Sequence, residues 1–298
     1  MSFLFKDFTG WKAYCETQEQ PLFEAVIAYE MQQKGRSRTE ILQGMEAAYS
    51  VMRQAIHTGL TEDMTSVSKM INNGAKKVYN NKLSVLSPAF QKLIARALAA
   101  KEVNSCMGRV VAAPTAGASG ILPGVFYTLQ EEHELTDGQI AESMLIAAGV
   151  ALIIEQKASL AGAVGGCQAE TGSAAAMASA GIVHALGGDI DQVFNAVGIT
   201  IQCMLGLVCD PVAGLVEVPC VVRNASASAI AFSSAQIALS GMDSIIPVDE
   251  CLDAMHEVGQ SMESRYKETA LGGMAATATG MAISKRVLIQ DIEMLSDE

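Results

Sequence analysis

Two cysteines stand in a segment whose composition could bring them together on a metal. Cys209 and Cys220 lie eleven residues apart in the apolar stretch 206–224, which also contains Pro211 and Pro219. On one continuous helix they would be about 16 Å apart along the axis, which is too far for a single metal centre. Each proline removes an amide donor and restricts the residue before it. We therefore expect the segment to turn back on itself and to bring the two sulfur atoms close together.

A third cysteine, Cys167, stands in the glycine-rich sequence GGCQAETGS, which we expect to open a helix of small residues. The positive end of that helix would favour the thiolate. Cysteines at an arbitrary spacing are more often buried packing residues, so packing remains the alternative. Three thiolates on a cubane iron-sulfur cluster would leave one iron without a protein ligand. That iron could act as a Lewis acid on a substrate oxygen.

The second chemical feature is the glycine-rich sequence APTAGASGILPG at residues 113–124. Amides at such a turn and at the helix start that follows it can form an anion-binding site. We predict that it receives a substrate carboxylate, through Thr115, Gly117, Ala118, Ser119 and Gly120. A tight loop between two helices would show the same glycine spacing. The sequence lacks the closing Gly-Lys-Ser/Thr of a P-loop and a surrounding βαβ unit, so we exclude nucleotide binding.

Together, GCQAE, CDPVAGLVEVPC and APTAGASGILPG resemble the iron-sulfur-dependent L-serine dehydratases. The similarity is to the alpha chain of the two-subunit bacterial form, and it is strongest over residues 104–280. The resemblance implies deamination of L-serine to pyruvate and ammonia. It also implies a [4Fe-4S] cluster on Cys167, Cys209 and Cys220, with the serine hydroxyl on the open iron.

The general base is not evident in this chain. The resemblance points to a Ser-His-Thr motif on a beta subunit, and none of His57, His133, His184 and His256 stands in such a motif. Glu170, three residues after Cys167, is the best acidic candidate, although it could equally orient ligands or cap its helix. We therefore predict that the alpha chain needs its beta subunit for full activity.

Three alternatives remain open at this stage. The same scaffold could act on L-cysteine, since a thiol would also bind open iron. The chain could be a non-catalytic subunit that carries a cluster. The cysteines could also hold structural zinc, although zinc sites favour four ligands at short paired spacings, unlike the long gap between Cys167 and Cys209.

Composition narrows the class of protein. The chain has 298 residues, half of them apolar, and a formal net charge of -12. Nucleic acids and anionic membranes attract positive surfaces, so we expect neither as a partner. The uncharged stretches 171–188, 192–209 and 224–242 are rich in Ser, Gly, Ala, Asn and Gln, which favours buried helices over membrane spans. Seven cysteines, an odd number, and the absence of a secretory signal pattern favour a cytoplasmic protein. We also expect an oligomer.

The periodicity of apolar residues predicts an all-α fold: a single compact multi-helix domain over residues 1–298, with N-terminal helices in 1–83. The expected helices are 21–34, 38–57, 60–79, 88–106, 137–157, 168–187, 190–207, 219–241, 248–262 and 273–288. Gly35 is expected to stop the first of these helices, and Ser37 or Thr39 to cap the second.

Overall fold

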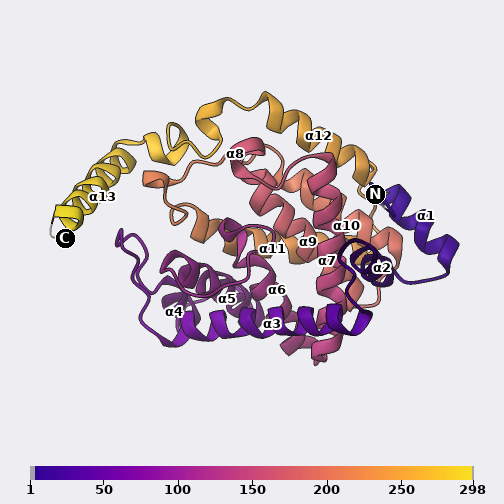
Figure 1. Cartoon of the computed structure of the whole chain (residues 1–298). Helices are drawn as coiled ribbons and strands as arrows, with labels where there is room; N and C mark the ends of the chain where they lie inside the picture. The colour runs from indigo at the N-terminus through magenta and orange to yellow at the C-terminus, as the bar shows by residue number, and fades with distance from the viewer. Residues whose placement is uncertain (1–3, 297–298) are drawn as a thin grey trace.

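The structure, a computed structural model, describes residues 4–296 (Figure 1). The first half contains α1 (Phe8–Gln18), α2 (Leu22–Lys34), α3 (Arg38–Thr61), α4 (Gly74–Tyr79), α5 (Pro88–Ser105), η1 (Ala116–Ala118), α6 (Ile121–His133) and α7 (Asp137–Lys157). The second half contains α8 (Gly162–Gly165), η2 (Gln168–Gly172), α9 (Ser173–Ala185), α10 (Ile190–Met204), η3 (Val212–Gly214), α11 (Cys220–Leu239), α12 (Val248–Ser261), η4 (Ser264–Tyr266), η5 (Gly273–Ala276) and α13 (Ala278–Ser296). Within the described residues, β pairing is limited to two isolated bridges, so the predicted all-α fold is confirmed.

Local capping signals fix several helix boundaries. Ser37 and Glu40 form a capping box at the start of α3, and Gly35 ends α2 in the left-handed conformation. Thr136 caps α7 and Asp189 caps α10 in the same way as Ser37 caps α3. These signals lie within a few residues of the boundary they set, which is why the sequence predicted most of these elements.

The buried helix α9 lies at the centre of the protein (Figure 1), in contact with α6, α7, α10 and α11. Its residues from Ser173 to Val183 are all buried, and most of them are alanine, serine or glycine. Small side chains allow the neighbouring helix backbones to approach closely. One large apolar cluster extends from Phe5, beside α1, to Met255 in α12, and two smaller clusters involve α3, α4 and α5.

One predicted helix is wrong over most of its length. The expected helix 60–79 is the end of α3, an irregular loop at 62–73 and the short helix α4. Polar side chains hold the loop: Met64 N donates to Asn73 Oδ1 at 2.8 Å, and Ser66 and Ser68 donate to Glu217. Serine and asparagine side chains compete with helical backbone bonds in this way. Their partner Glu217 is remote in sequence, so no local sequence pattern could predict this contact.

Two further details differ from the sequence prediction. The expected helix 273–288 divides into η5 and α13, and α13 projects from one side of the protein (Figure 1). One described helix, α7, is long and apolar enough to cross a membrane. Its most apolar window is 61% buried within the protein, as in the core helix of a soluble protein, and a single such helix is weak evidence for membrane insertion.

Candidate functional site

Cys167 is positioned by a sharp turn between α8 and the π-helical turn η2. Gly166 takes φ +74° there, and a Cβ on this residue would come within 2.6 Å of Met262 Sδ. Cys167 is buried, and its Sγ lies 2.9 Å from Thr171 Oγ1. Gln168 links this turn to the segment before Cys209, because its amide donates to Leu207 O and its Oε1 accepts from Gly206 N at 2.8 Å. The GCQAE motif therefore places one thiol and joins it to the chain that carries the second.

Cys209 and Cys220 flank a loop that turns back on itself, as the prolines predicted. Val212 N donates to Val218 O at 2.8 Å across this loop, and Cys220 is the first residue of α11. Cys209 is fixed on its other side, where its amide donates to Tyr266 O at 2.8 Å and its carbonyl accepts from Glu268 N at 2.9 Å. Both cysteines are buried.

The three thiols form one electrostatic group. Burial raises the pKa of Cys167, Cys209 and Cys220, in the last case to about 12. Charge on Cys167 raises the pKa of both other thiols as well. Burial opposes the thiolate preference that the helix dipole was expected to give Cys167, and that preference stays a prediction. Three thiolates here require a positive charge among them.

Arg223, one turn into α11, supplies part of that positive charge. Its guanidinium lowers the pKa of the Cys167 thiol. It also pairs with the buried Asp210 carboxylate at 2.8 Å and donates to Val208 O at 2.8 Å. Asp210 in turn accepts from Met274 N at 2.7 Å, which ties the ligand loop to η5.

Glu170 lies against the thiols. Cys209 Sγ is 3.8 Å from Glu170 Oε2, and a Cβ on Gly162 would meet both atoms, at 2.6 Å for the oxygen and 3.1 Å for the sulfur. Burial raises the pKa of the Glu170 carboxyl; Thr115 beside it partly offsets this, and Glu268 adds to it. Ligand atoms of Glu170, Cys209 and Glu268 all lie within 4.8 Å of one another, a spacing that could hold a metal ion.

The turn predicted to bind the substrate carboxylate lies next to this group but is less open than expected. Ala118, Ser119 and Gly120 are buried, and Gly120 N already donates to Asn224 Oδ1 at 2.8 Å. The amides of Ala118 and Ser119 bond within η1. Thr115 is half-buried, and Gly117 faces the Glu170 carboxyl, from which a Cβ there would be 3.1 Å. The part of the turn whose amides are not used in these hydrogen bonds is therefore 115–117.

Comparison with known proteins gives a direct match over most of the chain. The family model described as "Serine dehydratase alpha chain" matches residues 17–275. The chain belongs to the serine dehydratase alpha chain family. It is 41% identical over 277 residues to "L-serine dehydratase, alpha chain" of Peptoniphilus asaccharolyticus, covering 92% of this chain and 95% of that protein. It is 41% identical over 267 residues to "Probable L-serine dehydratase, alpha chain" of Bacillus subtilis, covering 89% of each.

Longer relatives contain the same region as part of a larger chain. "L-serine dehydratase" of Streptomyces coelicolor is 35% identical over 274 residues, which are 90% of this alpha chain but 60% of that protein. The family resemblance read from the three motifs is therefore confirmed, and membership of this family suggests a metal cofactor. The residues that would bind this cofactor stay a proposal.

Asn224 is a site residue that the sequence did not reveal. It is fully buried in α11, where its Nδ2 donates to Gly117 O and to Cys220 O, both at 2.8 Å, and its Oδ1 accepts from Gly120 N. One side chain thus joins the carboxylate turn to the helix that begins at Cys220. Asn224 and Gly117 are more than a hundred residues apart, so no spacing in the sequence could have found the pair.

Lys101 was also missed. It is fully buried in α5, and its Nζ donates to Val216 O at 2.8 Å and to Asn104 Oδ1 at 2.6 Å. Burial lowers its pKa to about 8, while charge on Cys220 and Glu217 opposes that shift. A lysine in an apolar helical pattern usually lies at the surface, which is why the sequence offered no signal.

Of the four histidines in this alpha chain, His256 is the one that lines a small pocket with Gly165 and Gln168, near Cys167. His57, His133 and His256 are exposed. His184 packs edge-on against Phe23, with ring centroids 5.8 Å apart. Among the remaining cysteines, Cys203 is exposed and Cys106 is half-buried, although both stand in apolar helical patterns. Cys15 and Cys251 are buried.

Proposed function

We propose that this chain is the alpha subunit of a two-subunit L-serine dehydratase, which converts L-serine to pyruvate and ammonia. Its membership of the alpha chain family supports the activity. The observation that carries the proposal is the meeting of three buried thiols, from three parts of the chain, beside Glu170 and the 115–117 turn.

We propose that Cys167, Cys209 and Cys220 hold a [4Fe-4S] cluster. Thiolates are the ligands that such clusters prefer, and the burial of these three would keep water away from them. The pKa values of the thiols stay raised despite the charges of Arg223 and Lys101, which leaves a deficit of positive charge that a metal centre would supply. When bound, a cluster with three protein ligands would act as a Lewis acid on the serine hydroxyl.

The residues of this chain bind the substrate and move protons. Elimination of water from serine requires one group to take the α-proton and another to protonate the departing hydroxyl. Glu170 retains a proton more readily than an ordinary carboxyl, which suits it to the second task at its Oε2 atom. The amides at 115–117, with the Thr115 hydroxyl, would hold the substrate carboxylate.

We assign the α-proton base to the beta subunit, since this chain lacks the Ser-His-Thr motif that the family resemblance implies. The aminoacrylate released by elimination tautomerises to an imine, and water hydrolyses the imine to pyruvate and ammonia. Alpha chain alone is therefore expected to be far less active than the complex of both subunits. We also propose that residues 1–298 form one domain of a cytoplasmic, oligomeric enzyme, without nucleic-acid or membrane partners.

The test is anaerobic purification with metal analysis and with optical and electron paramagnetic resonance spectra, recorded with and without L-serine. Wild type is expected to contain iron and sulfide and to show a cubane signal that serine perturbs. Cys167→Ala, Cys209→Ala and Cys220→Ala should each remove the signal. Cys251→Ala is the matched control, because Cys251 is equally buried but lies in α12, and it should retain the cluster.

Other results would point to different chemistry. Zinc in place of iron would favour a closed structural site, or an ion on Glu170, Cys209 and Glu268. A cluster that ignores serine but responds to L-cysteine would change the substrate. A cluster without turnover in the presence of the beta subunit would leave a non-catalytic role.

A further inference from the structure

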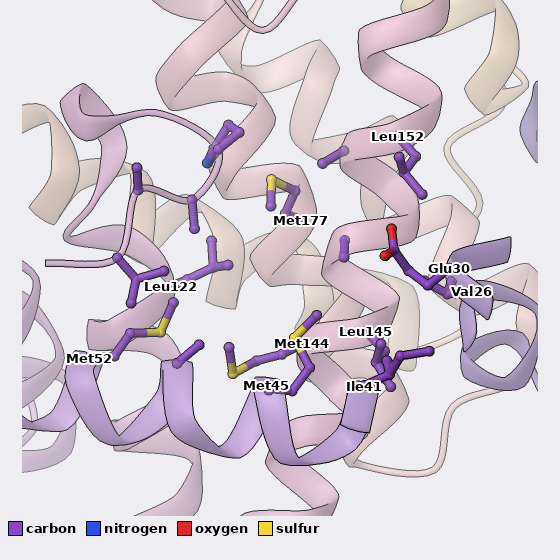
Figure 2. A pocket seen from close by; sticks show the side chains of 18 of the residues that line it. Val26, Glu30, Ile41, Met45, Met52, Leu122, Met144, Leu145, Leu152 and Met177 are labelled. Carbon is purple, nitrogen blue, oxygen red and sulfur yellow. The ribbon is translucent and has the colours of Figure 1, made fainter. Parts of the chain in front are cut away.

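A cavity of about 400 Å³ lies between α2, α3, α7 and the segment 111–114, away from the three thiols. Its wall is mostly apolar and includes the four methionines Met45, Met52, Met144 and Met177, which line the same space in Figure 2. Small-molecule sites in proteins are concave, mostly apolar and roughly 300–1,000 Å³ in volume. An engineered apolar cavity of about 150 Å³ already binds benzene, so this one has room for a larger ligand.

Charged groups stand at the edge of this cavity. Glu30 and Glu155 both line it, and both lie near Tyr29, whose pKa their charges help to raise. Figure 2 shows the Glu30 carboxylate on the same side of the cavity as Val26 and Leu152. Among residues 4–289, whose side chains the structure describes, neither the Glu30 nor the Glu155 carboxylate has a hydrogen bond or an ion pair. Arg36, which also lines the cavity, is exposed and has no ion pair in the same range.

We propose that this cavity binds an apolar α-amino acid. The side chain would lie among the methionines, whose flexible thioethers adapt to ligands of different shape. The ammonium group would pair with Glu30 and Glu155, and the carboxylate would face Arg36. Two carboxylates and one guanidinium around an apolar space match the charges of a zwitterion with an apolar body. L-leucine and L-methionine have this chemistry, whereas L-serine lacks the apolar part.

The cavity is connected to the proposed catalytic site by a segment of the chain. Part of the cavity wall is formed by residues 111–114, and the chain continues from them directly into the 115–117 turn. Among the described residues, none forms a backbone hydrogen bond with residues 109–114, so side-chain packing alone holds this segment. A ligand in the cavity would add contacts to the segment and stabilise one position of the turn that follows it.

Isothermal titration calorimetry of the full chain with L-leucine and L-methionine tests the proposal. Both are expected to bind, and L-serine should give no signal that depends on the cavity. Isopentylamine, which lacks the carboxylate, should bind about tenfold more weakly than leucine, as should 4-methylpentanoate, which lacks the ammonium group, since a charge-assisted bond is lost in each case. Equal binding of leucine and isopentylamine would contradict the role of Arg36.

Variants identify the site. Glu30→Gln should weaken leucine binding about tenfold or more, and Ala48→Phe should abolish it by filling the cavity that Ala48 lines. Glu62→Gln is the matched control, because Glu62 is an exposed carboxylate at the end of α3, outside the cavity, and it should bind like wild type. Circular dichroism melting would show that each variant is folded. Absence of leucine and methionine binding by wild type at 10 mM, taken as about the weakest affinity worth testing, would overturn the proposal, as would binding that survives Ala48→Phe.

Hydrogen exchange tests the connection to the turn. Leucine should slow exchange of the amides of residues 110–113 several-fold, and unchanged exchange would separate the cavity from the catalytic site. None of these measurements requires the cluster or turnover, so Cys209→Ala should bind leucine as wild type does. Failure of the dehydratase assignment would therefore be distinguishable from failure of this one.

Discussion

Replacement of Asn224 tests the proposed connection between the carboxylate turn and the ligand helix. In Asn224→Ala, Gly117 O and Gly120 N lose their hydrogen-bond partner, and both glycines are buried. Cys220 O also loses a bond, but it lies in the first turn of α11, where the helix itself offers a donor. Each buried group left unpaired costs about 1–3 kcal/mol. The expected loss in the free energy of unfolding is therefore about 2–6 kcal/mol, a large share of the roughly 5–15 kcal/mol of a typical protein.

Urea-induced unfolding of the metal-free chain measures this loss from the shift of the midpoint. Ser228→Ala is the matched control: it lies one turn further along α11, is equally buried, and loses only the bond from its Oγ to Asn224 O. We expect a loss of about 1 kcal/mol or less for that variant. Asn224→Asp should also destabilise, because it keeps the acceptor for Gly120 N but places an oxygen against two carbonyls. Losses for Asn224→Ala and Ser228→Ala that agree within about 0.5 kcal/mol would refute the reasoning.

Three further predictions concern buried charges around the site. Burial raises the pKa of Glu170 above 4.5 in the folded state. The favourable contribution of Glu170 to the free energy of unfolding is therefore complete below pH 4.5 and is lost as the pH rises through the raised value. Glu170→Gln should gain stability relative to wild type between pH 4.5 and 8, and parallel stability-against-pH profiles of the two proteins would contradict this. Burial lowers the pKa of Lys101 from 10.5 to about 8. The contribution of Lys101 to the free energy of unfolding is therefore complete above pH 10.5 and is lost as the pH falls through 8. The free energy of unfolding, measured at pH 7.5 and 9.5, should rise more for wild type than for Lys101→Met at the higher pH. An equal change in both proteins would mean that the ammonium is better solvated than its burial implies. The double substitution Ser66→Ala and Ser68→Ala removes both hydroxyl donors from the buried Glu217 carboxylate and should lower the free energy of unfolding by about 2–4 kcal/mol, with Ser84→Ala, in an exposed loop, as the near-neutral control.

The sequence predicted those parts of the site whose causes are local. Pro211 and Pro219 act on their own and the adjacent backbone, so the return of the 209–220 loop followed from their positions. The glycine-rich turn before Cys167 and the capping box at Ser37 are set within a few residues in the same way. Helices with regular apolar spacing were likewise predictable, because the period of the pattern is the period of the helix.

The sequence failed where side chains find partners far along the chain. Residues 62–73 have helical spacing, yet Ser66 and Ser68 bond to Glu217 and hold the segment as a loop. Some of the amides expected to bind a carboxylate already have hydrogen-bond partners, because Gly120 N donates to Asn224 Oδ1. Cys203, on a largely apolar helix, faces outward, because the apolar run of α10 covers more than the face that packs on α9.

By itself, the amino-acid sequence determined the all-α fold, most helix boundaries and the family, because capping, proline geometry and motif order act over short distances or are written directly in the chain. Only the tertiary structure decided which groups meet. It placed Glu170 against Cys209, joined the turn to α11 through Asn224, and buried Lys101 beneath the ligand loop. It also left a cavity between α2, α3 and α7. These contacts arise when helices distant in sequence pack together, and burial then shifts the pKa values on which the proposed chemistry depends.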